Sequence, residues 1–150
     1  MSTTVQSTYS RYMPAGVAGT LDMSANNNVD TKQAEGNIAF GIAVSKGDAD
    51  DGVVAAGSIY VGVSVRDITI VHDTADRYEA GDNCAVATRG DMWVTVEDAV
   101  QAQTAVKYNT TTGALGSSGG TTIVDAFWLT SAGAGELAKV RLLDTLDITT

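Results

Sequence analysis

Apolar and polar residues alternate most clearly at residues 59–66. Four aliphatic side chains occupy every second position there: Ile59, Val61, Val63 and Val65. In a strand, successive side chains point to opposite faces, so a period of two places all four on one face. The pattern therefore predicts a strand over this segment, with the aliphatic face buried.

The other apolar segments are short, and turns rich in Gly, Asn and Asp separate them. This punctuation is typical of strands joined by hairpins. Further strands are expected at residues 38–44, 84–88, 92–96, 105–108, 121–130 and 136–143, with turns at 46–52, 80–83, 89–91, 110–113 and 117–120. Only residues 97–103 could hold a helical turn, too short to form a layer. Roughly seven or eight strands at this spacing predict an all-β sandwich or small barrel.

The first 36 residues lack this pattern. They are rich in Ser, Thr, Asn, Gly and Ala, and their few bulky side chains follow neither period. Pro14 is the only proline, and it favours an extended backbone at Met13. We therefore expect an extended N-terminal arm at residues 1–36 and a β-barrel body at residues 37–150. An undocked, disordered tail is the alternative for the arm.

Composition and charge narrow the function. The net charge is −9, and no Lys/Arg cluster occurs that could neutralise a row of phosphates, so no nucleic-acid partner is expected. No apolar run approaches the ~18 residues of a membrane-spanning helix, and the first residues do not resemble a secretion signal. The single cysteine excludes an internal disulfide. We expect a soluble protein that is neither exported nor embedded in a membrane.

Candidate chemistry is sparse. A nucleophilic site would combine Cys84 with His72, but neither lies in a recognisable motif, and a small buried thiol is the commoner role for a lone cysteine. The acidic turn at residues 48–51 lacks the ligand spacing of a calcium loop, and no phosphate-binding glycine motif is present. Arg89-Gly90-Asp91 is interpreted as a tight turn. We therefore predict no catalytic residue, no metal and no cofactor.

The order of segments along the body resembles the structural cement (capsid decoration) proteins of bacteriophages. The segments that carry the resemblance are residues 38–44, 60–67, 78–82, 89–94, 96–100, 112–115 and 130–142. One departure is Gln101-Ala102-Gln103-Thr104, where a Gly-Asp turn would be expected. The resemblance implies a small β-barrel or β-tulip body that sits as an oligomer on the outside of the phage head and touches several capsid subunits. It implies no catalytic residues.

The resulting hypothesis is a non-enzymatic protein that clamps neighbouring major capsid protein subunits together. Its expected partners are the major capsid protein and itself, as a homotrimer first and a dimer second. The arm would add a strand to an exposed edge of a neighbour, anchored by Tyr9, Tyr12 and Met13 beside Pro14, because aromatic side chains dominate interface energetics. The alternatives are a carbohydrate-binding β-sandwich that uses Trp93 or Trp128, and a hydrolase with Cys84 or an aspartate as nucleophile.

Overall fold

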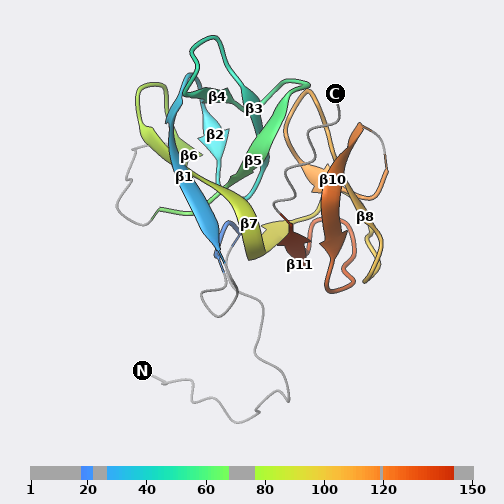
Figure 1. The fold of residues 1–150 in the computed structure, drawn as a ribbon. Helices are drawn as coiled ribbons and strands as arrows, with labels where there is room; N and C mark the ends of the chain where they lie inside the picture. Colours follow the sequence, from blue (N-terminus) through green and yellow to red (C-terminus); the bar gives the residue numbers. More distant parts are fainter. Residues whose placement is uncertain (1–17, 22–26, 68–76, 119, 144–150) are drawn as a thin grey trace, which may run out of the picture.

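The computed structural model describes residues 18–21, 27–67, 77–118 and 120–143. Two β-units share one long strand, β7 (Asn83–Thr95) (Figure 1). The first unit is a barrel of five strands: β1 (Asn28–Ala34), β4 (Gly52–Val54), β3 (Ala43–Lys46), β5 (Tyr60–Ser64) and the first half of β7. It closes because β1 pairs in parallel with β4 and antiparallel with β7.

The second unit, here called the second sheet, begins where β7 leaves the barrel. Its strands follow the order β7, β11 (Leu137–Leu142), β10 (Thr121–Trp128), β8 (Ala105–Tyr108) and β9 (Leu115–Gly116). A separate two-stranded ladder joins β2 (Ile38–Ala39) to β6 (Arg77–Tyr78). β7 changes partners at Gly90, since Arg89 pairs with β1 and Gly90 pairs with β11.

Small and β-branched side chains form most of two hydrophobic clusters. One lies inside the barrel, and the other joins the second sheet to Ala43, Val63 and Ala87 of the barrel strands. β11 shows how the sequence produces such a cluster: Ala138, Val140 and Leu142 are buried, and they alternate with the less buried Lys139 and Arg141. Burial of one such aliphatic side chain contributes roughly 1.5–3 kcal/mol to stability. The largest fully buried side chains include Trp128, Tyr78, Tyr108, Ile38, Met92 and Leu115.

The prediction of an all-β barrel body is confirmed. The described residues form eleven strands and no helix, and three of these strands contain only two residues, which short-range periodicity does not reveal. Residues 97–103 form no helical turn; Val100 pairs with Ala132 in an isolated bridge. Within the described part of the chain, no helix has the length and apolarity needed to cross a membrane.

The prediction for β5 is only partly correct. Val63 is buried as expected, but Ile59 is 62% exposed and Val61 is half-buried. Gly62 and Ser64, on the supposed polar face, are buried instead. The reason is that β5 is covered on both faces, so Ser64 lies inside, where its hydroxyl donates to the carbonyl of Ala39 (2.7 Å).

One strand prediction and one turn prediction are wrong. Residues 38–44 form two strands, because a turn at Phe40–Ile42 with Gly41 at φ +77° interrupts them. Arg89-Gly90-Asp91 lies inside the continuous strand β7 and forms no turn. Gly90, at φ +130°, is instead the position at which this strand passes from the barrel to the second sheet.

Residues 28–34 belong to the segment assigned above to the N-terminal arm, yet in the structure they are β1 of the barrel. β1 pairs with β7 from Asn28↔Arg89 to Gln33↔Asn83, and Ala34 is buried. Most side chains of β1 are polar, so apolar and polar residues do not alternate along it. Backbone pairing is the main interaction that holds this strand in the barrel wall, with Ala34 buried in the core and Asn28 bonded to Thr88.

Candidate functional site

The predicted anchors Tyr9, Tyr12, Met13 and Pro14 lie outside the described residues. The structure does describe residues 18–21, here called the arm root, which follow them in the chain. The amide of Gly19 donates to the carbonyl of Trp93 (2.7 Å), and the amide of Trp93 donates to the carbonyl of Thr20 (3.0 Å). The amide of Arg66 donates to the carbonyl of Gly19 (2.8 Å). The arm root is therefore bonded to β7 on one side and to the chain after β5 on the other.

Two glycines make this close approach possible. Gly19 has a φ of +86° and Gly41 a φ of +77°, both in a region that side chains disfavour. A Cβ on Gly41 would lie 2.7 Å from the amide nitrogen of Gly19, and a Cβ on Gly19 would lie 3.0 Å from the Cβ of Phe40. No side chain fits at Gly41 without displacing the arm root.

Aromatic packing in the barrel supports the arm root. The rings of Phe40 and Tyr78 meet edge to face, with centroids 5.1 Å apart. The guanidinium carbon of Arg66 lies 5.3 Å from the centre of the Phe40 ring. The Tyr78 hydroxyl donates to the carbonyl of Val65 (2.5 Å), and burial raises its pKa. The root therefore rests on a buried, hydrogen-bonded layer of the barrel.

No sequence pattern predicts the arm root. Gly19 and Gly41 are 22 positions apart and lie in no motif, and their contact depends on two positive φ angles that a single sequence does not display. Leu21 lies in a segment without helical or strand periodicity. In the structure it pairs with Met92 and packs, half-buried, against the core of the second sheet.

Cys84 is fully buried, and desolvation raises the pKa of its thiol to about 12. A thiol with that pKa is protonated at neutral pH, and the protonated form is a poor nucleophile. His72, its predicted base, lies outside the described residues. Cys84 packs in the barrel core with Val86 and Tyr78. The structure therefore gives no support to a cysteine-dependent hydrolase.

The acidic turn between β3 and β4 is a hairpin, as its sequence indicates. Asp48, Asp50 and Asp51 are exposed there. The carboxylate of Glu35 accepts hydrogen bonds from the amides of Asp48 (3.1 Å) and Ala49 (3.4 Å) and so holds the turn in place. Across the described ranges, no three His, Cys, Asp or Glu side chains come together as metal ligands would.

The aromatic residues considered for sugar stacking are unequal. Trp128 is fully buried, so it offers no face to a ligand. Trp93 is half-buried in β7, and the ammonium of Lys139 lies 5.9 Å from the centre of its ring.

Asp91 of the Arg-Gly-Asp sequence is only 5% exposed, and its carboxylate accepts two hydrogen bonds from the Arg141 guanidinium, at 2.8 and 3.0 Å. Trp128 and Asp91 are therefore inaccessible to a ligand, and Trp93 is only partly exposed.

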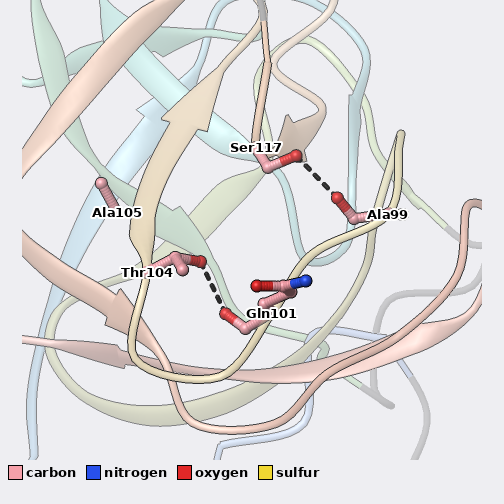
Figure 2. Close-up of a pocket in the computed structure, with 5 residues that line it drawn as sticks. All are labelled: Ala99, Gln101, Thr104, Ala105 and Ser117. Carbon is pink, nitrogen blue, oxygen red and sulfur yellow. Dashed lines mark hydrogen bonds between the residues drawn. The ribbon is translucent and has the colours of Figure 1, made fainter.

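A hollow of about 430 Å³ opens beside the loop after β7, and Figure 2 shows the residues that line it: Ala99, Gln101, Thr104, Ala105 and Ser117. Its two hydroxyl groups already donate to main-chain carbonyls, Ser117 to Ala99 and Thr104 to Gln101, each at 2.6 Å. None of the described residues that line it is charged, although the Ser117 hydroxyl also lies 3.3 Å from the Asp98 carboxylate. Hydrogen bonds from Ser118 and Ser117 lower the pKa of Asp98, so its carboxylate is a weak base for this hydroxyl.

Comparison with protein families gives a match over residues 5–143 to the family described as "Structural cement protein (E217 gp24/Pam3 gp6)". This range covers almost the entire chain. The chain belongs to the phage structural cement protein family. A comparison with curated protein sequences gives no match.

A solved structure supports this fold. The chain is similar to a protein in "The capsid of Myoviridae Phage XM1", with a TM-score of 0.69 and 15% identity over 96% of this chain and 100% of that one. It also matches the head fiber gp8.5 N base of bacteriophage phi29, at a TM-score of 0.49 and 13% identity over 80% of this chain and 97% of that one. Its structural role in the phage follows from the family match over residues 5–143.

Proposed function

We propose that this cement protein binds the outer surface of the phage head, without enzymatic activity, and stabilises contacts between neighbouring major capsid protein subunits. The arm root carries the proposal. Because Gly19 and Thr20 are bonded to β7 and to Arg66, the chain before them starts from a fixed point on a rigid body. A contact made by that segment would transmit force to the barrel rather than only to a loose tail.

The proposed binding segment surrounds Tyr9, Tyr12, Met13 and Pro14. These side chains supply most of the bulky surface of the first 17 residues. An extended segment can add a strand to an open sheet edge of a capsid subunit, with affinity from main-chain hydrogen bonds and specificity from the side chains that enter pockets. Pro14 would limit the pairing on its side, since it has no amide to donate.

The proposed partners include other copies of the chain, as a homotrimer first and a dimer second. Several arms on one oligomer bind a lattice multivalently, so moderate single contacts give slow dissociation. The net charge of −9 supports an outer position, because an inward-facing acidic surface would meet the negatively charged packaged genome.

The test adds purified protein to heads that lack it and measures bound copies per head by sedimentation and gel densitometry. Deleting residues 2–14 should leave a folded body that no longer binds heads or protects them against heating. Undiminished occupancy by the truncated protein would contradict the arm as the binding element.

A point variant separates binding from folding. Tyr12→Ala should weaken head binding at least about tenfold, as expected for a lost aromatic anchor, while the Tm of the free protein stays unchanged. Thr8→Ala, in the same segment, is the matched control and should alter neither quantity. A large fall in Tm for Tyr12→Ala would place this side chain in the core of the body.

A further inference from the structure

The outward face of the second sheet carries two cations next to two aromatic rings. β11 supplies the cations: Lys139 and Arg141 alternate with buried residues, so both point away from the core. Trp93 of β7 pairs with Lys139, and Phe127 of β10 pairs with Arg141. The Lys139 ammonium and the Arg141 guanidinium carbon each lie 5.9 Å from the centre of the neighbouring ring. These four residues are here called the cationic face.

The cationic face has the chemistry to bind a carboxylate. The Arg141 side chain is 43% exposed, and its bonds to Asp91 use Nε and one hydrogen of Nη2. A guanidinium carries further N–H groups that can donate to a second acceptor. Asp91 is only 5% exposed, so the exposed charges of these residues are positive. The half-buried rings of Trp93 and Phe127 add apolar area, and aromatic side chains together with Arg are enriched at protein interfaces.

The β3–β4 turn of the same protein has the opposite charge. Asp48, Asp50 and Asp51 are exposed there. Glu35 fixes the backbone of the turn, because its carboxylate accepts the amides of Asp48 and Ala49. A turn that is already ordered loses little conformational entropy when it binds. The aspartates are therefore presented on a rigid support.

The turn and the cationic face lie on different parts of the molecule. In Figure 1 the β3–β4 turn lies at the upper end of the barrel, and β11 lies at its lower end beside β7. The turn does not reach the cationic face of its own chain, but it can reach that of a second copy. Two copies of net charge −9 repel each other except where opposite charges meet, and this pairing brings opposite charges together.

We propose that the cationic face binds the acidic β3–β4 turn of a second copy of this chain. The carboxylates of the turn accept hydrogen bonds from Lys139 and Arg141, and the rings of Trp93 and Phe127 support the backbone of the turn. Each copy uses its turn on one neighbour and its cationic face on another. Such a head-to-tail contact closes into a ring when its rotation permits. The proposal rests on the self-association put forward above and names the surfaces that carry it.

Sedimentation velocity of the full-length protein tests this contact by exchanging charges. Asp50→Lys/Asp51→Lys makes the turn cationic, and Lys139→Glu makes the face acidic. Each variant alone should self-associate at least about fivefold more weakly than the parent protein, and about 0.5 M salt should weaken the parent as well. An equimolar mixture of the two variants should associate again, because each turn then meets a face of opposite charge.

Matched controls carry the same charge changes elsewhere. Asp30→Lys/Glu97→Lys alters two exposed acids outside the turn, and Lys32→Glu alters a half-buried lysine of β1. Both should associate like the parent protein. The Tm of every variant reports folding, and Lys139→Gln replaces Lys139→Glu if the latter does not fold. Lys139→Gln should weaken association by a smaller factor, since it removes a charge without reversing it.

Three results would overturn the proposal: a parent protein that stays monomeric at about millimolar concentration, charge variants that associate like the parent, or a mixture that associates no better than its components. Association that arises only on heads would assign the cationic face to a capsid subunit and would also overturn it. The chain lacking residues 2–14 should self-associate like the parent. This result separates a failure of the contact between copies from a failure of the arm.

Discussion

Gly41 and Gly81 both adopt a positive φ, of +77° and +95°, but their surroundings differ. A Cβ on Gly81 would meet no atom within 4 Å, whereas one on Gly41 would lie 2.7 Å from the Gly19 amide. Gly81→Ala should therefore cost only the left-handed backbone strain, about 1–2 kcal/mol. Gly41→Ala should cost clearly more, because the arm root must also move. Urea denaturation of both variants measures the difference, and equal costs would show that the arm root yields freely.

The Asp91–Arg141 pair is a second contrast at this scale. Asp91 is 5% exposed, so Arg141→Ala leaves its carboxylate buried without its cation and should lower the free energy of unfolding by about 1–3 kcal/mol. Glu79→Gln removes the charge from the exposed pair with Arg77, 3.5 Å away, and should change stability by less than about 1 kcal/mol. Thermal and urea denaturation compare the two, and similar losses would contradict a special role for the buried pair.

The role of a residue could be predicted from the sequence where that role depends on the residue type and not on a distant partner. The lone Cys84 was expected to be a buried thiol, and it is. The roles of Asp91 and Gly41 could not be predicted, because each depends on a partner more than 20 positions away, Arg141 and Gly19 respectively. An isolated Arg-Gly-Asp tripeptide gives no information about such a partner.

At the scale of elements, carboxylates next to glycines hold two loops. Glu35 holds the β3–β4 turn, where a Cβ on Gly47 or Gly52 would overlap its carboxylate. Asp98 accepts hydrogen bonds from the Ser117 amide (2.7 Å) and from the Ser118 hydroxyl. A Cβ on the preceding Gly116 would lie only 2.3 Å from the Asp98 carboxylate. In both loops glycine leaves room for the acceptor that satisfies the turn.

Asp98 makes the loop after β9 sensitive to acid. The hydrogen bonds from Ser118 and Ser117 lower the pKa of its carboxyl below the ordinary 3.8. The stabilisation is therefore present above pH 3.8 and is lost as the pH falls through the lowered value. A carboxyl NMR titration should give a midpoint below 3.8; a midpoint at or above it would contradict the hydrogen bonds. Asp98→Asn should also flatten the acid side of the stability profile.

Elements were predicted well where a strand has one solvent-exposed face, and poorly elsewhere. β11 and β8 lie within the expected ranges, because their buried residues alternate with more exposed ones. β1 was missed because its side chains are mostly polar, and its place depends on pairing with β7 and β4. The strand expected at residues 38–44 is divided because a positive φ at Gly41 breaks it.

For the whole molecule, the fold class and family could be predicted, but the arrangement could not. The sequence indicated one small barrel, whereas the chain forms a five-stranded barrel and a second sheet that share β7. Nothing in residues 83–95 marks the exchange of partners except Gly90, which the sequence analysis placed in a turn. Gly90 predicts a break in the strand, but its actual role depends on the long-range pairing of β7 with β1 and β11.

A cryo-EM map of heads that carry the protein tests the central claim most directly. The account predicts the β-body on the outside of the shell, in several copies around a symmetry axis, with residues 1–17 leading from the arm root across the junction between major capsid protein subunits. Density for Tyr9 to Pro14 should lie against a capsid sheet edge. A body on the inner surface, or an outer body whose first 17 residues contact no capsid subunit, would contradict the account.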